Sequence, residues 1–370
     1  MNKLRVLVVE DSLTVRRRLC EVLTEDPDIE VVGEAEDGKT AIELCDKLRP
    51  DIMCLDMILP VMSGLATTEY VMAHFPTPIL VVSASFNRGE VFKTFDALAA
   101  GAVDVLEKPR GDEREGEWER TFIETVKMVS RIKVITHLRG RMSGYGRPAT
   151  ATALRRGTPL AVGIGSGSAG KAPQVVALGA STGGPGALVD VLRGMPDVFG
   201  LPVLMVLHID EPFGDSLAEW LGSQTGRTVV YPRNGEPLAT NIGRVVMAPP
   251  GLHLVVEAGR LRLNTTPERN SCRPSIDVLF ESLAQELGDT TAACLLTGMG
   301  RDGASGLLQI RQAGGRTIAQ DEATSVVYGM PREAALLGAA EQILPLGEIG
   351  RAMNELVKHP EHQEWRRPNR

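Results

Sequence analysis

The sequence predicts an α/β protein of two domains, each built on a largely parallel β-sheet. Short apolar segments alternate with amphipathic segments over residues 3–110, and the alternation returns over residues 173–357. Between them, residues 140–172 contain no Asp or Glu and are rich in Gly, Ala, Ser, Thr and Pro, which is typical of a flexible linker. We therefore expect an N-terminal domain over 1–139, this linker, a C-terminal domain over 173–357 and a polar tail over 358–370.

The composition limits the class of protein. Hydrophobic residues make up 43% of the 370 residues and charged residues 24%, as in soluble globular chains. The net charge of -7 argues against a large nucleic-acid surface. No apolar run is long enough for insertion across a membrane, and the N-terminus leads into a strand rather than a signal peptide. The five cysteines form no C-x-x-C pair, so we interpret them as small core residues in a reducing cytoplasm.

Five strands alternating with helices in the N-terminal domain indicate a doubly wound parallel sheet. The expected strands are residues 4–9, 30–35, 51–56, 78–84 and 102–107, and the expected helices are 13–24, 39–48, 65–74 and 88–99. Residues 113–138 carry an apolar stripe, which predicts a last helix that runs on into a connector.

Polar side chains follow four of these strands, at the edge where such sheets bind ligands. Glu10 and Asp11 follow the first strand, Asp56 ends the third, Ser83 the fourth, and Lys108 follows the fifth. Because three carboxylates in one crevice repel each other, a hard divalent cation such as Mg²⁺ would stabilise the group. The lysine and the hydroxyl would then hold the oxygens of a phosphoryl group on Asp56.

These residues stand in motifs that resemble the receiver domain of response regulators. The motifs are Val8–Ser12, Leu55–Met57, Pro60–Gly64, Ser83-Ala84 and Lys108-Pro109. The resemblance implies that Asp56 accepts a phosphoryl group from a sensor histidine kinase, while Glu10 and Asp11 hold Mg²⁺ beside it. It also implies that Ser83 is the switch hydroxyl and that Lys108 contacts the phosphate.

The C-terminal domain is predicted to be an α/β sheet, largely parallel, with an antiparallel hairpin insertion. The expected strands are residues 174–180, 202–207, 228–231, 244–248, 252–257, 260–264, 291–296 and 316–319. The expected helices are 185–193, 213–222, 275–287, 303–312, 331–337 and 347–357. We interpret residues 234–264 as a β meander with turns at 249–251 and 258–259.

A glycine-rich turn at Ser181 joins the first strand of this domain to its first helix. The apolar run 175–178 precedes the turn, and Pro185 suits the first turn of the helix because its missing N–H would have no partner there. The Ser181 hydroxyl should be exposed beside the backbone amides of the helix start. Such amides bind either a phosphate or a developing oxyanion, and the turn alone does not decide which.

A nucleophilic serine needs a base, and the base needs an orienting acceptor. His208 directly follows the apolar strand 202–207, whose end would share an edge with Ser181 if the two strands are parallel neighbours. His253 lies within an apolar hairpin and is interpreted as structural. Asp302 lies in a second glycine-rich turn, where it either caps the helix that follows Gly303 or completes a triad. The order Ser–His–Asp and the absence of G-x-S-x-G argue against an ordinary α/β-hydrolase.

Longer motifs make the likeness specific: the domain resembles the chemotaxis protein-glutamate methylesterases. The motifs are Gly179–Gly184, His208, Leu296–Ala304 and Ala319–Glu333. The resemblance implies a receiver-regulated serine esterase that hydrolyses methyl esters on glutamates of the chemoreceptor cytoplasmic domain, for sensory adaptation in chemotaxis or a related pathway. Many members also deamidate receptor glutamines.

The same resemblance implies the roles of single residues. Ser181 is the nucleophile, His208 the base and Asp302 the orienting acid. Thr182 and Met299 help to position the histidine and form the oxyanion site. No cofactor is needed in this domain, and the receiver covers the mouth of the serine site until it is phosphorylated.

Five residues depart from the two family patterns. Ser63 stands where receivers usually have Asp, and Val105 where many have an aromatic switch residue. Asp210 and Glu211 add negative charge after His208, and Gly214 replaces a usual Thr. If close to the imidazole, the two acids would raise its pKa and weaken it as a base at neutral pH.

Two other interpretations remain open. One is a receiver joined to a nucleotide-binding module with residues 179–184 as its phosphate loop, although this loop fits neither G-x-G-x-x-G nor G-x-x-x-x-G-K-[ST]. The other is a response regulator that acts only as a binding protein with an idle triad, which the acidic neighbours of His208 favour.

Overall fold

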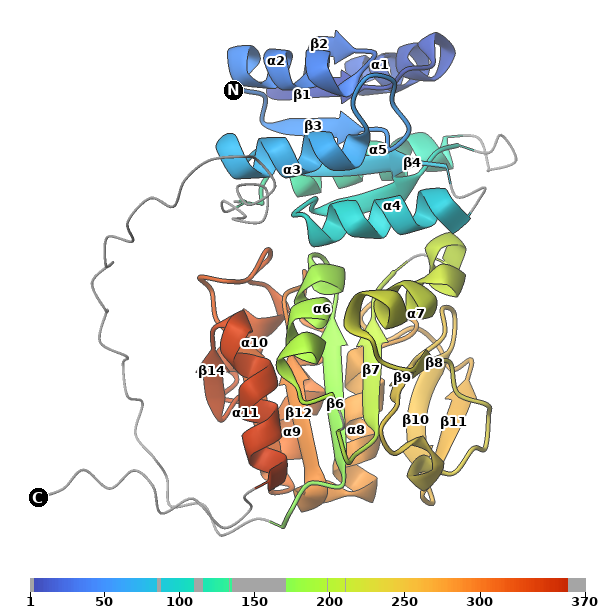
Figure 1. Cartoon of the computed structure of the whole chain (residues 1–370), viewed down its shortest axis with the longest axis vertical. Helices are drawn as coiled ribbons and strands as arrows, with labels where there is room; N and C mark the ends of the chain where they lie inside the picture. The colour runs from blue at the N-terminus through green and yellow to red at the C-terminus, as the bar shows by residue number, and fades with distance from the viewer. Residues whose placement is uncertain are drawn as a thin grey trace, which may run out of the picture.

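The computed structural model describes residues 3–84, 88–109, 116–132, 134, 171–197, 199–209 and 211–358, which form two α/β domains (Figure 1). Almost all of the predicted linker and of the polar tail lies outside these residues, so both stay predictions. Among the described helices, none has the length and apolar character needed to cross a membrane.

The N-terminal domain has the predicted five-stranded parallel sheet, in the order β2-β1-β3-β4-β5. Its strands are β1 (Leu4–Val9), β2 (Ile29–Ala35), β3 (Ile52–Leu55), β4 (Ile79–Ser83) and β5 (Asp104–Glu107). Its helices are α1 (Leu13–Glu25), α2 (Gly38–Leu48), α3 (Gly64–His74), α4 (Arg88–Ala99) and α5 (Glu117–Val129). Leu19 of α1 and Phe122 of α5 share one buried cluster, and α2, α3 and α4 contribute to the cluster on the other face. Both faces are covered, which explains why the strands are apolar throughout.

Helix α5 ends earlier than the sequence predicted. The amides of Arg131 and Ile132 donate to the carbonyls of Met128 and Val129, three residues back, and these tighter bonds close the helix after Val129. Ile132 still packs against the cluster beneath α5. Its apolar character therefore reflects burial in a turn, not continuation of the helix. Parts of the predicted range (113–115, 133 and 135–138) lie outside the described residues.

The C-terminal domain is built on a seven-stranded parallel sheet in the order β14-β13-β12-β6-β7-β9-β8. Its strands are β6 (Val175–Ala180), β7 (Val203–Leu207), β8 (Val229–Val230), β9 (Val245–Met247), β12 (Thr291–Leu295), β13 (Arg316–Gln320) and β14 (Gln342–Leu344). Its helices are α6 (Gly184–Gly194), α7 (Glu211–Thr225), α8 (Ile276–Glu286), α9 (Ala304–Gln312), α10 (Met330–Leu336) and α11 (Leu346–Lys358). Strand β6 is buried along its whole length between β12 and β7, so the three strand ends meet at one edge.

The predicted antiparallel hairpin is present as β10 (His253–Glu257) and β11 (Arg260–Asn264). It closes at Ala258 and Gly259, whose φ angles of 49° and 67° suit a two-residue hairpin turn. The wider β meander predicted for residues 234–264 is wrong. Strand β9 pairs in parallel with β7 and β8, because the chain before it passes through a 3₁₀ helix (Leu238–Asn241) instead of reversing in a hairpin.

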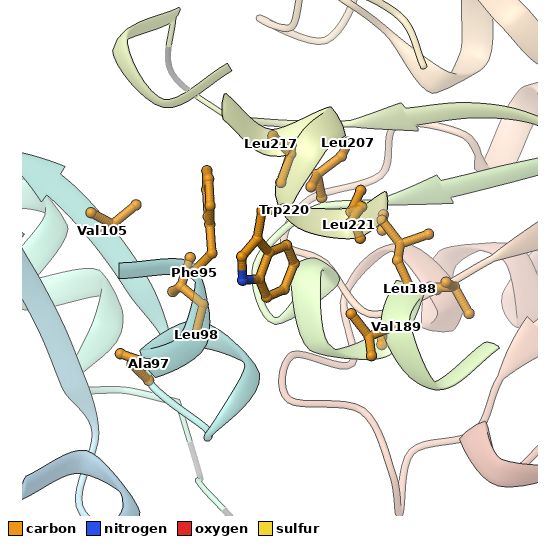
Figure 2. Packing of buried hydrophobic residues seen from close by; sticks show 14 of the residues in the cluster. Phe95, Ala97, Leu98, Val105, Leu188, Val189, Leu207, Leu217, Trp220 and Leu221 are labelled. Carbon is orange, nitrogen blue, oxygen red and sulfur yellow. The ribbon is translucent and has the colours of Figure 1, made fainter. Parts of the chain in front are cut away.

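The two domains pack through α4 of the first against α6 and α7 of the second (Figure 1). Trp220 of α7 is fully buried, and its ring centroid lies 5.3 Å from that of Phe95 on α4 (Figure 2). The indole Nε1 of Trp220 donates to Asp96 Oδ1 at 2.8 Å, and Gln224 Nε2 donates to the same oxygen at 3.2 Å. Apolar packing and hydrogen bonds to one carboxylate therefore hold the receiver against the second domain.

Candidate functional site

Ser181 follows β6 on a turn that only small residues allow. Its amide donates to Thr297 O at 3.0 Å, and its carbonyl accepts from Gly184 N at 2.6 Å. Gly183 has φ of 76°, and a Cβ there would lie 2.6 Å from Val326. A Cβ on Gly298 would lie 2.7 Å from the Cβ of Ser181, so the chain after β12 also approaches this serine closely. Glycines in the loops that follow β6 and β12 therefore allow this turn.

His208 lies at the end of β7, next to the Ser181 turn, as the parallel sheet requires. Its amide donates to Ala180 O at 3.1 Å, directly before Ser181. Its ring Nε2 lies 3.0 Å from Asp302 Oδ2. Among the described residues, no hydrogen bond joins His208 to the Ser181 hydroxyl. The predicted serine, histidine and acid thus come from three adjacent strand ends, with the histidine–acid pair formed.

Asp302 is buried and accepts hydrogen bonds on both oxygens. Besides the histidine, Oδ2 accepts from Ile276 N at 2.6 Å, and Oδ1 accepts from Ser275 Oγ at 2.7 Å and Asn270 Nδ2 at 2.9 Å. The alternative in which Asp302 caps the helix after Gly303 is wrong, because α9 has no side-chain cap. The carboxylate lies at the N-terminus of α8, whose free amides and positive dipole end favour a negative charge.

The pair is tuned toward its ionised form. Burial raises the pKa of Asp302, but the hydrogen bonds from His208, Asn270 and Ser275 outweigh it and lower the pKa below the usual value. Burial likewise lowers the pKa of His208, yet the hydrogen bonds to Asp302 and Cys272 outweigh it and raise the pKa to about 9. Asp210 and the side chain of Glu211 lie outside the described residues, so their effect on the pKa of His208 stays a prediction.

Two contributors to the site were missed from the sequence. Cys272 Sγ lies 3.6 Å from His208 Nδ1, and Asn270 links Asp302 to Asp277 through its Nδ2, at 2.9 Å to each carboxylate. The sequence offered one signal: both residues lie shortly before α8, the helix whose first backbone amides donate to Asp302. The core interpretation, which rested on three cysteines in apolar segments, does not hold for Cys272, which is partly buried and lines a groove of about 510 Å³.

Thr182 directly follows Ser181 in the chain, and Met299 directly follows Gly298, which lies against Ser181. Thr182 O accepts from Thr297 Oγ1 at 3.0 Å, and half of the Met299 surface is exposed in the groove that Cys272 and Asp302 also line. Within the described part of the chain, no hydrogen bond joins either residue to His208. His253 is structural, as predicted: it is buried, its Nδ1 accepts from Ser275 N at 3.1 Å, and its Nε2 lies 3.2 Å from Pro267 O.

A second polar cluster lies at the carboxyl edge of the N-terminal sheet, where it was predicted. Glu10 and Asp56 are buried, and Lys108 Nζ lies 2.7 Å from Glu10 Oε2 and 3.1 Å from Asp56 Oδ1. Burial, followed by the charge of Asp56, raises the pKa of Glu10, and burial raises that of Asp56. Oxygen atoms of Glu10, Asp11 and Asp56 lie within 4.8 Å of one another, and this all-carboxylate donor set fits Mg²⁺. Ser83 is buried at the end of β4 on the same edge.

Fold and sites together define a two-domain response regulator whose output domain carries a serine beside a histidine–aspartate pair. The family model for the response regulator receiver domain matches residues 6–115, and that for CheB methylesterase matches residues 176–353. The chain belongs to the CheB methylesterase family.

Relatives match the chain over nearly its whole length. A protein-glutamate methylesterase/protein-glutamine glutaminase of Anaeromyxobacter dehalogenans is 41% identical, over 96% of this chain and 97% of the relative. One of Syntrophus aciditrophicus is 40% identical, over 96% of this chain and 98% of the relative. The solved catalytic domain of Thermotoga maritima CheB methylesterase is 34% identical with a TM-score of 0.48, over 50% of this chain and 100% of that one. The names of the two relatives favour an esterase over a nucleotide-binding output domain.

Proposed function

We propose that this protein is a phosphorylation-regulated esterase that hydrolyses glutamate methyl esters on chemoreceptors, and that it also deamidates receptor glutamines. The observation that carries the proposal is the His208–Asp302 hydrogen bond of 3.0 Å at the strand end next to Ser181. The names of the relatives supply the substrate, because they join methylesterase and glutaminase activity in chains of the same length.

The geometry favours Nδ1 of His208 as the base. Nε2 faces the Asp302 carboxylate and so carries a proton, which leaves the lone pair of the neutral ring on Nδ1. Ser181 Oγ attacks the ester carbonyl carbon and gives its proton to Nδ1. Asp302 stabilises the imidazolium that forms.

The remaining steps follow from the balance of atoms. The carbonyl oxygen becomes an oxyanion, which backbone amides of the Ser181 turn and of Met299 would hold, with Thr182 shaping the turn. The bond to the methoxy group breaks, and methanol leaves with the proton from Nδ1. Water then attacks the glutamyl–serine ester, with His208 again as base, and releases the glutamate carboxylate. With a glutamine substrate, ammonia leaves in place of methanol.

The receiver would control this site through α4. The last residue of α4, Ala99, lies so close to α6 that a Cβ on Gly186 would approach its Cα to 3.3 Å. The end of α4 also lines a small cavity with Gly183 and Thr297, next to Ser181. In this proposal a sensor histidine kinase phosphorylates Asp56, and the receiver then leaves α6 and α7. Glu10, Asp11 and Asp56 would hold Mg²⁺, which neutralises charge on the phosphoryl group; Lys108 and Ser83 would bind its oxygens.

Methanol release from methylated receptor membranes tests the proposal. The wild type and Ser181→Ala are compared with and without a small phosphodonor and Mg²⁺. We expect release by the wild type that rises with phosphodonor and is lost in Ser181→Ala. Release that persists in Ser181→Ala would refute the serine mechanism. Release that does not change with phosphodonor would support the esterase activity and refute control by the receiver.

A further inference from the structure

Cys272 occupies the side of the His208 ring at which the proposed base nitrogen lies. Its Sγ is 3.6 Å from Nδ1 and 3.4 Å from Asn270 O. A thiol has one weak donor and a sulfur that accepts weakly. Cys272 can therefore donate its S–H to the carbonyl of Asn270 while its sulfur faces the imidazole.

The turn that carries Cys272 is built in an unusual way. Asn270 and Ser271 both have positive φ, 53° and 60°, and neither is glycine. Arg269 and Cys272 close the turn with a pair of backbone hydrogen bonds, of 3.2 Å and 3.0 Å. Left-handed residues other than glycine are strained, and such strain persists where the surroundings over-determine it. The turn is held at an energetic cost in the conformation that brings the thiol to Nδ1.

The same turn also holds the orienting acid. Asn270 Nδ2 donates to Asp302 Oδ1 at 2.9 Å and to Asp277 Oδ2 at 2.9 Å. One short segment thus contacts the acid on one side of His208 and presents a sulfur to the other side. Both ring nitrogens have a partner: Asp302 at Nε2 and Cys272 at Nδ1.

We propose that Cys272 is a positioning residue for His208: it fixes the plane of the imidazole and accepts a weak hydrogen bond from Nδ1–H once the ring is charged. With the thiol proton on Asn270 O, the Nδ1 lone pair stays free for the proton of Ser181. After that transfer, the sulfur stabilises the imidazolium until the proton passes to the leaving group. This inference rests on the proposed function, which supplies the proton transfer.

The electrostatics around His208 are consistent with this role. Asp302, from the loop between β12 and α9, and Cys272, from the turn before α8, are the titratable groups that contact the ring among the described residues, and both raise its pKa. Behind Asp302 lie Asp277 of α8 and His253 of β10. Arg301 and Glu333 also line the groove.

The test replaces Cys272 and measures the histidine itself. The pKa of the His208 ring is followed by NMR titration of histidine-labelled full-length wild type, Cys272→Ala and Cys272→Ser. We expect the pKa to fall by about one unit in Cys272→Ala, since a hydrogen-bond acceptor of the charged form is lost. Cys272→Ser should restore part of it. Cys20→Ala, a change to a partly buried cysteine of the receiver, is the control and should not move it.

Kinetics on methylated receptor membranes form the second arm. In Cys272→Ala, kcat on the alkaline plateau of the pH profile, where His208 is fully deprotonated, should fall by about tenfold with little change in KM, because the thiol acts through the base. The acid limb of the pH profile should move to lower pH with the NMR value. If Cys272→Ala unfolds, Cys272→Val, which fills the space of the thiol without an acceptor, gives the same reading.

The outcomes separate this inference from the proposed function. An unchanged His208 pKa in Cys272→Ala would overturn the positioning role, whatever the activity. Activity that survives in Ser181→Ala and is lost on further replacement of Cys272 would make the thiol a nucleophile and also overturn it. A shifted pKa in a protein without esterase activity would uphold the contact and refute the proposed function alone.

Discussion

The contact between Asp96 and α7 offers the sharpest test of how the receiver restrains the output domain. Asp96 Oδ1 accepts from Trp220 Nε1 at 2.8 Å and from Gln224 Nε2 at 3.2 Å, across the domain boundary. Hydrogen bonds to a charged acceptor contribute about 1.5–3 kcal/mol when shielded from water. Asp96 is only half-buried, so we take about 1.4 kcal/mol for both bonds after solvent screening, which corresponds to about tenfold in the ratio of closed to open protein.

Asp96→Ala should therefore raise methanol release without phosphodonor by up to about tenfold. Release at saturating phosphodonor should stay unchanged, since the residue lies on α4 and not at Ser181. Asp46→Ala, at an exposed acid of α2 outside the interface, serves as the matched control. Equal basal release in Asp96→Ala and wild type would refute the reasoning that this contact holds the closed form. Lower release in both conditions would instead indicate damage to the fold.

Four further predictions concern the two sites. Because the pKa of His208 is raised to about 9, kcat/KM should rise with pH through neutrality and reach half its limit near pH 9; a limb near pH 6.5 would contradict this. The same shift means that protonated His208 stabilises the folded state. This contribution is complete below the unfolded pKa of about 6.5 and is lost as the pH rises through about 9. The free energy of unfolding in urea, measured at several pH values, tests this. Asp302→Asn should lower kcat by about 10³–10⁴-fold, since the ring loses its charged acceptor, and should also lower the melting temperature at neutral pH, because one amide oxygen cannot accept all the hydrogen bonds that the two carboxylate oxygens accept; an unchanged kcat would refute the role of Asp302. Asp56→Asn should keep basal methanol release and lose its increase with phosphodonor, and an increase that survives would refute Asp56 as the phosphoacceptor.

The positions of Ser181 and His208 could be predicted because parallel strands impose them. Each residue follows an apolar run that must be a buried strand, and neighbouring parallel strands end at one edge. The same rule placed Glu10, Asp56 and Lys108 together. This part of the site depends only on local pattern and on the rule that such strands run side by side.

The surroundings of the histidine could not be predicted in this way. Asp302 lies at the N-terminus of α8, a helix that precedes it by 26 residues in sequence, and the local pattern suggested the helix directly after it. Cys272 and Asn270 reach the site from a turn with two positive φ angles, for which no glycine gives a signal. The burial of Trp220 against Phe95 depends on how two separately predicted domains dock. All three features depend on distant parts of the chain.

Helix α4 gives the coupling between the two sites a physical route. Its Phe95 belongs to the receiver core, while its Asp96 holds α7 and its Ala99 lies against α6. Packed interiors resist gradual deformation, so a change at the strand ends near Asp56 that moves α4 must either break these contacts or be opposed by them. Gly186 permits the close approach of Ala99 two residues after Gly184, whose amide bonds Ser181 O. The helix that the receiver can move therefore contacts the helix whose first turn fixes the serine, and this direct contact makes a longer relay unnecessary.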